Sequence, residues 1–211
     1  MFDALERIEV HVRSVIAHEL GKISPLAYTN DEYIRAKFKK MEPGKQSTWD
    51  TFLVKQQNLI VRSKEDYIIW HRETNKSIPF WVVVETWDFG MLNWYYRMLK
   101  SEYQAIICRR IDAAIIQVLG NWLDALNTLR NECAHHSRIW NMRLQNKVKL
   151  ISAPYFDGIC PEDEQKHKII VCISIIWYLL HAIGPSSRWI YHVDRLFCAM
   201  PTLPHCSLLN I

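Results

Sequence analysis

Residues 169–183, IIVCISIIWYLLHAI, form the longest apolar run in the chain and constrain its fold more than any other segment. The run is shorter than the roughly 20 residues that an α-helix needs to cross a bilayer, and His181 interrupts it. A helix that is apolar on every side must be buried on every side. The segment therefore predicts a buried helix over 166–183, stopped by the GPSS that follows it, with other helices packed around it.

The remaining segments also favour helices. Residues 3–20 place apolar side chains at helical spacing, with acidic residues early and Gly21 just after the predicted end. In SIPFWVVVETWDFGMLNWYYRML, residues 77–99, Ser77 and Pro79 favour a helix start, whereas the run of three valines favours a strand. The length of this segment and its repeated aromatics favour a single helix.

Further helical segments complete an all-α pattern, and no internal repeat interrupts it. The predicted helices are 49–72, 102–118, 121–136 and 186–199, with a break at Gly120-Asn121 and a connecting loop over 151–165. The strongest candidate boundary is Pro43-Gly44, within residues 43–48. The sequence therefore predicts an all-α fold that forms a single domain over residues 1–211.

Charge and cysteine usage restrict the class of protein. The net charge of +4 and a pI near 8.7 are compatible with a nucleic-acid partner, and equally with a protein that is merely soluble. Six cysteines are scattered without a CxxC pair, mostly in apolar runs, where free cysteine behaves as a small hydrophobic residue. The opening MFDALERIEVHVR is charged and is not a secretory signal. These features predict a reducing, cytoplasmic setting and no membrane span.

The stretch LRNECAHHSRIWN, residues 129–141, concentrates the polar residues that could carry chemistry. On a helical wheel, Trp122, Leu126, Leu129 and Cys133 fall on one stripe, which must face the core. Asn131 and His135 fall on the opposite face, one turn apart. The same phase places His136 beside the apolar stripe, which predicts a partly buried histidine paired with Glu132 one turn earlier.

Two readings other than catalysis apply to this stretch. An exposed histidine beside an arginine is more often a plain surface feature than a reactive group. Cys133, His135 and His136 are close in sequence, but their side chains diverge on a helix, and a zinc site needs ligands one turn apart and further ligands elsewhere. The pattern therefore favours no metal site.

The same residues match a known family. RNECAHHSRIWN closely resembles the RNxxAHHxRxWN segment of the Abi-like abortive-infection proteins (AbiD/AbiF type), which belong to the HEPN superfamily of small α-helical domains. The opening LERIEVHVRS, the segment IPFWVVVETWDFGMLNWYYRML and the approach NWLDALNTLRN resemble further segments of that family. The resemblance covers most of the chain and implies a HEPN-like helical bundle with additional helices.

The resemblance implies a metal-independent endoribonuclease without a cofactor, in a bacterial antiphage or toxin-like system. Its R-x4-H motif is carried by Arg130 and His135, with Asn131 in the polar position after the arginine. This chemistry is reasonable because RNA contains its own nucleophile, the 2′-hydroxyl. His135 can transfer protons near neutral pH, and Arg130 can bind a phosphate through two parallel hydrogen bonds.

Further residues are expected to support the site or to bind RNA. We expect His136, Glu132 and Glu85 to support the site. Four basic residues could steer RNA toward it, and Trp140 could stack a base or act as a buried anchor. The basic residues are Arg138, Arg143, Lys147 and Lys149.

The spacing of the motif also predicts an assembly. Arg130 and His135 lie about 140° apart around a helix, so they do not converge easily on one phosphate within a single chain. Two such helices at a two-fold axis could bring both pairs into one cleft, and HEPN relatives are similarly dimeric. We therefore expect a homodimer acting on RNA, with an RNA or protein antitoxin as a possible partner. The alternative is a non-catalytic module that binds RNA or protein.

Overall fold

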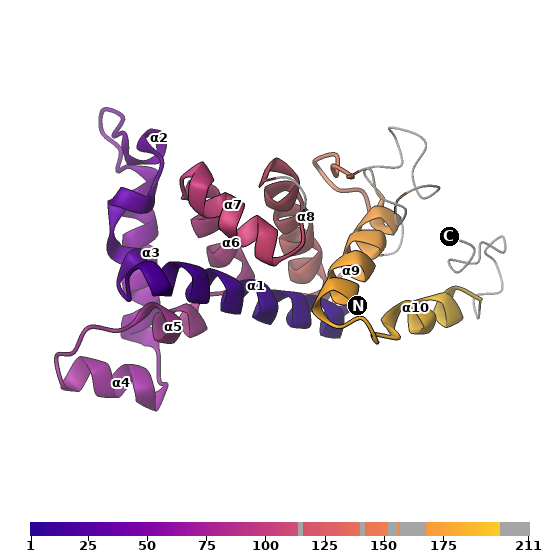
Figure 1. Cartoon of the computed structure of the whole chain (residues 1–211), viewed down its shortest axis with the longest axis horizontal. Helices are drawn as coiled ribbons and strands as arrows, with labels where there is room; N and C mark the ends of the chain where they lie inside the picture. The colour runs from indigo at the N-terminus through magenta and orange to yellow at the C-terminus, as the bar shows by residue number, and fades with distance from the viewer. Residues whose placement is uncertain (114–115, 140–141, 152–155, 157–167, 199–211) are drawn as a thin grey trace. The chain divides into compact units, whose positions relative to one another are not determined.

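A computed structural model describes residues 1–113, 116–139, 142–151, 156 and 168–198, and every regular element in these residues is helical. The chain divides into two compact units. We call Met1–Glu9 with Ile111–Ile211 the terminal unit, and Val10–Arg110 the central unit. Figure 1 labels the helices along the chain. The predicted all-α class is confirmed.

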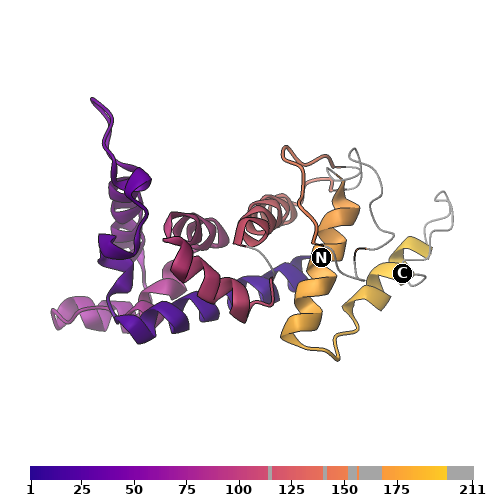
Figure 2. The ribbon, with the colours of Figure 1, turned by 45° about the horizontal axis from the view of Figure 1, so that its top comes forward.

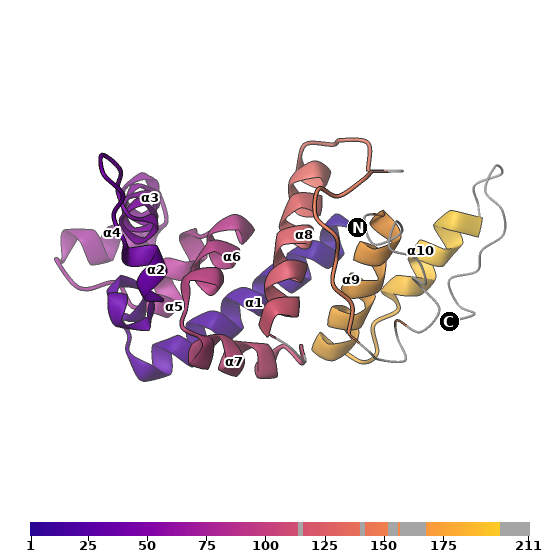
Figure 3. The same ribbon diagram turned by 90° about the horizontal axis from the view of Figure 1, so that it is seen from above.

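The terminal unit consists of the start of α1 and three further helices. Their bounds are α1, Phe2–Ile23, of which the first residues belong to this unit, then α8, Ile116–Ala134, α9, Ile169–Ile183, and α10, Trp189–Cys198. The apolar run predicted to be a buried helix is α9, which ends at Gly184. A short turn leads from α9 into α10 (Figure 2). Within this unit α8 crosses the N-terminal part of α1 (Figure 3).

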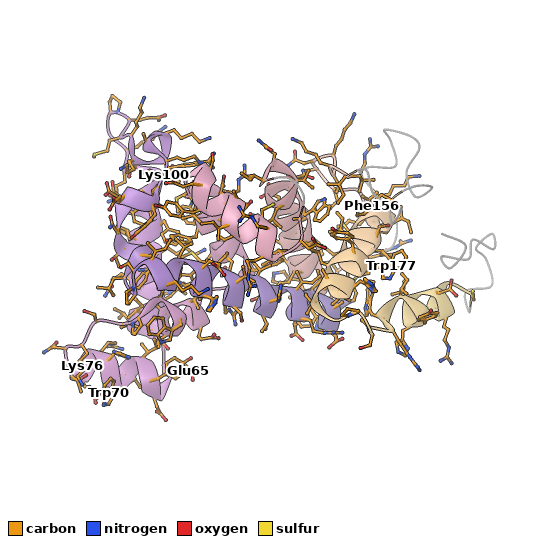
Figure 4. All side chains as sticks on the ribbon, in the orientation of Figure 1. Glu65, Trp70, Lys76, Lys100, Phe156 and Trp177 are labelled. Atoms are coloured by element: carbon orange, nitrogen blue, oxygen red, sulfur yellow. The ribbon has the colours of Figure 1, made fainter. Side chains whose placement is uncertain are left out.

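Side chains of α8 hold the extended segment that precedes Ile151. The Asn121 side chain donates to the carbonyl of Lys147 at 3.0 Å and accepts from the backbone N–H of Lys149 at 2.6 Å. The indole N–H of Trp122 donates to the carbonyl of Lys149 at 2.6 Å. The Trp122 ring also packs with Phe156, which Figure 4 labels, and with Tyr178 of α9.

The central unit contains the rest of α1 and six shorter helices around an aromatic core. Their bounds are α2, Ala36–Lys39, α3, Thr48–Arg62, α4, Asp66–Glu73, α5, Phe80–Val83, α6, Phe89–Met98, and α7, Ser101–Arg110. The rings of Trp87 and Tyr95 contact each other and both contact Phe52 and Phe80, at centroid distances of 5.2–5.6 Å, and all four are buried. Burial raises the pKa of the Tyr95 hydroxyl well above its usual range.

Several predicted helix boundaries are wrong. Residues 49–72 form two helices, α3 and α4, and α1 continues past Gly21 to Ile23. The segment 77–99 is not one helix, because the chain is extended at Trp87 and Asp88 between a short 3-10 turn and α6. The Asp88 carboxylate accepts the N–H of Met91 at 2.7 Å, so this residue caps α6 and favours a new start. The predicted break at Gly120 lies inside α8, and the chain turns instead at Asp112, where φ is 60°.

Three further expectations from the sequence concern the boundary at Pro43-Gly44, the loop over 151–165 and membrane-spanning helices. Pro43-Gly44 forms a turn between α2 and α3 within the central unit, with φ of 75° at the glycine. Apart from Ile151 and Phe156, the predicted loop over 151–165 lies outside the described residues. Among the described residues, none of the helices is both long enough and apolar enough to span a membrane.

Candidate active site at the end of helix α8

Helix α8 exists because its apolar residues recur on one face. Trp122, Leu126 and Leu129 are fully buried and Cys133 is half-buried, as the helical wheel predicted. Burial raises the pKa of the Cys133 thiol; the nearby N-terminal amine lowers it and Glu132 raises it. A thiol whose charged form is disfavoured is a poor nucleophile, so Cys133 belongs to the packing of the helix.

The helix ends in a tight reversal at its two histidines. The N–H of His136 donates to the carbonyl of Cys133 at 3.1 Å, and the N–H of Ser137 donates to the carbonyl of Glu132 at 2.9 Å. His136 has a φ of 53°, the left-handed conformation in which helices most often place glycine. This paired arrangement is a Schellman motif, which satisfies the last carbonyls of the helix.

The reversal separates the roles of the two histidines. His135 keeps a helical hydrogen bond, because its N–H donates to the carbonyl of Asn131 at 3.0 Å. Asn131 and His135 are exposed, as predicted for the face opposite the core. The prediction that His136 is partly buried is wrong, since its side chain is exposed. The helical phase used for that prediction no longer applies once the backbone turns at His136.

Arg130 is held by a buried acid from the first helix. Its Nε lies 3.4 Å from the Oε2 of Glu9, and the two side chains are 28% and 9% exposed, respectively. The Nε atom itself is buried and forms no hydrogen bond within the described residues, so the contact with Glu9 is an ion pair without hydrogen-bond geometry, and the exposed part of the arginine side chain lies elsewhere on it. A carboxylate that is largely withdrawn from water binds an arginine more strongly than an exposed one, provided the pair stays together.

Glu9 was not among the site residues predicted from sequence, although a signal for it exists. It lies four residues after Leu5 and three before Val12, within the apolar stripe of α1. An acid in such a stripe requires a buried partner. The sequence cannot say which of the 26 basic residues that partner is.

The predicted supporting and RNA-binding residues are distributed over several segments. Glu132 is half-buried near the end of α8, and Arg138 is exposed just after the reversal. Arg143, Lys147 and Lys149 are exposed, whereas Leu144 and Val148 are buried. Asn121 and Trp122 bind the backbone at Lys147 and Lys149, so the backbone of these two basic residues is attached to α8. Trp140 lies outside the described residues.

Glu85 belongs to the central unit and has a partner there. Its carboxylate is 3.2 Å from Arg13, whose other terminal nitrogen donates to the carbonyl of Trp87 at 3.0 Å. The structure therefore gives Glu85 an ion pair within its own unit.

A metal site was the second alternative to catalysis considered for residues 129–141. Within the described residues, no group of three or more histidine, cysteine, aspartate or glutamate side chains is arranged to hold a metal ion. The end of α8 instead combines a guanidinium held by a buried carboxylate with an exposed imidazole and an exposed amide. These groups can bind a phosphate and transfer protons.

Comparison with known protein families identifies a relationship. The family model described as Abi-like protein matches residues 1–141, which include Glu9 and the whole of α8. No curated protein matches the chain. No solved structure matches it either.

Proposed function

The chain belongs to the Abi-like protein family, and from this premise we propose that it is a metal-independent endoribonuclease of an abortive-infection system. The observation that carries the proposal is the end of α8, where Arg130 is paired with buried Glu9 and His135 is exposed at the last helical hydrogen bond. The pairing leaves the arginine a permanent cation at the same end of α8 as the exposed histidine.

The proposed reaction needs only these groups and the RNA. A 2′-hydroxyl attacks the adjacent phosphorus, the bond from phosphorus to the 5′-oxygen breaks, and the products carry a 2′,3′-cyclic phosphate and a free 5′-hydroxyl. His135 removes the proton of the 2′-hydroxyl or protonates the leaving 5′-oxygen. Arg130 stabilises the additional negative charge of the pentacoordinate transition state. Asn131, on the same face one turn earlier, orients the imidazole or contacts the phosphate.

One histidine cannot be both the acid and the base in the same instant. We propose that a second copy of the chain supplies the other histidine, so that the site is composite and lies on a two-fold axis. The spacing supports this, because side chains five residues apart on a helix diverge by about 140°.

The test of catalysis uses purified protein, mixed RNA and excess chelator. The proposal predicts cleavage with the stated end groups, and its loss in His135→Ala without a change in melting temperature, because His135 is exposed. Cleavage that requires an added divalent metal ion would overturn the mechanism. RNA binding without turnover, unchanged in His135→Ala, would instead indicate a non-catalytic binding module.

The test of the composite site mixes His135→Ala subunits with wild-type subunits after dissociation and reassociation. If both histidines of a dimer are needed, activity follows the square of the wild-type fraction, about a quarter at equal mixing. Activity near a half at equal mixing would show that each chain acts alone.

A further inference from the structure

A second candidate site lies in the central unit. A cavity of about 750 Å³ is lined by residues of α1, the segment from α5 into the following 3-10 turn, and the end of α7. All of its lining residues belong to the central unit. Its volume is in the range of cavities that bind small molecules, about 300–1,000 Å³.

Trp81 provides an aromatic surface at this cavity. The side chain is 53% exposed although it belongs to a helix at the edge of the aromatic core. A Cβ atom on Gly21 would lie 3.4 Å from the six-membered ring of Trp81, so the indole lies directly against α1. That distance is ordinary van der Waals contact, so one edge of the ring packs on the helix. The rest of the ring remains available for stacking.

The rim of the cavity carries an excess of positive charge. Glu19 is only 13% exposed and is contacted by both Arg110, at 3.3 Å, and Lys22, at 3.8 Å. One carboxylate therefore faces two permanent cations. Glu19 does not itself line the cavity, and the acid that does, Glu85, is paired with Arg13 at 3.2 Å. The excess charge favours an anionic ligand.

His11 adds a polar group to the lining. Burial, and secondarily the positive charge of Arg110, lower the pKa of its imidazole from the ordinary value of 6.5. The imidazole is therefore neutral at pH 7, and a neutral ring both donates and accepts one hydrogen bond. Groups of this kind can contact the edge of a heterocycle.

An aromatic plane beside a cationic rim matches a ligand that has a planar ring and a phosphate. We propose that this cavity binds a nucleotide, with the base stacked on Trp81 and the phosphate at Lys22 and Arg110. The nucleotide is either a free mononucleotide or one unit of an RNA strand, since both offer the same chemistry. The proposal does not depend on cleavage at Arg130 and His135.

The experiment is calorimetric titration of the full chain with uridine and adenosine monophosphates, the matching nucleosides, inorganic phosphate and a short single-stranded oligonucleotide. Trp81→Ala should weaken binding of the monophosphates by about 5- to 150-fold, which corresponds to the loss of one stacked base. Trp81→Phe should fall between this variant and wild type. Tighter binding of the oligonucleotide than of either monophosphate would identify a strand as the source.

Two matched controls separate the site from general surface effects. Trp70→Ala removes another exposed tryptophan of the central unit, 48% exposed and contacted by Lys76 (Figure 4), and should leave binding unchanged. Lys22→Ala should weaken the monophosphates by about 2- to 5-fold and leave the nucleosides unaffected. Lys45→Ala, which breaks a similar i,i+3 pair with Glu42, should have no effect.

Three results would overturn the proposal. One is no monophosphate or oligonucleotide binding at millimolar concentration, and another is binding that Trp81→Ala and Trp70→Ala change equally. The third is a change in oligomeric state in Trp81→Ala without a change in nucleotide affinity, which would make this surface an interface with a second copy.

Discussion

Replacing His136 with glycine should make the protein more stable. The residue has a φ of 53° and an exposed side chain, so the substitution relieves the backbone without removing a buried contact. A left-handed conformation costs an L-residue roughly 1–2 kcal/mol. Glycine loses about 0.5–1 kcal/mol more backbone entropy on folding. The difference predicts a gain of about 0.5–1 kcal/mol in the free energy of unfolding.

His135→Gly is the matched control, since it removes the same side chain one residue earlier. His135 is also exposed, but its N–H keeps the helical hydrogen bond to Asn131 and its φ is not positive. Glycine at position 135 relieves no backbone strain and loses more backbone entropy on folding, so His135→Gly should lower the free energy of unfolding by about 0.5–1 kcal/mol. Two adjacent histidine substitutions should therefore change stability in opposite directions.

Thermal unfolding followed by circular dichroism measures both effects. For a chain of this size, 1 kcal/mol corresponds to roughly 2–4 °C, so His136→Gly should raise the melting temperature by about 1–4 °C. His136→Ala should change it little, because alanine has the same conformational preference. A lower melting temperature in His136→Gly, or a loss above about 1 kcal/mol in His136→Ala, would refute the reasoning and indicate a buried contact of His136.

Three further predictions follow from single contacts. Glu9→Gln should lower the free energy of unfolding by about 1–3 kcal/mol, because Arg130 then lies half-buried beside a neutral amide. If the Glu9→Gln and Arg130→Met changes in the free energy of unfolding simply add in the double variant, the ion pair does not stabilise the fold. Asp88→Ala should cost about 1 kcal/mol through loss of the cap of α6, and Asp88→Asn should keep most of it, as urea unfolding would show. Because the pKa of His11 is lowered in the folded state, folding favours the neutral imidazole. The free energy of unfolding should therefore decrease as the pH falls below 6.5 toward the pKa of His11 in the folded protein. Arg110→Gln should raise the pKa of His11 in an NMR titration, and no rise would exclude the assigned repulsion.

Local patterns in the sequence determined the helices and one face of α8. Residues 169–183 are apolar on all sides, and they form a buried helix that ends at Gly184. The stripe of Trp122, Leu126 and Leu129 is buried, and Asn131 and His135 are exposed opposite it. These features depend on periodicity over one or two turns, which is a property of neighbouring residues.

Contacts between residues that are distant in sequence are determined only by the tertiary structure. The pairing of Glu9 with Arg130 joins side chains 121 positions apart, and the apolar stripe of α1 indicates only that some basic partner is required. The exposure of His136 depends on where the helix stops, because a single left-handed residue redirects every side chain that follows. The cavity beside Trp81 is lined by residues from distant parts of the chain, such as Gly21 and Arg110. Such contacts depend on how whole helices pack against one another, and the packing energy is distributed over many residues that are distant in sequence.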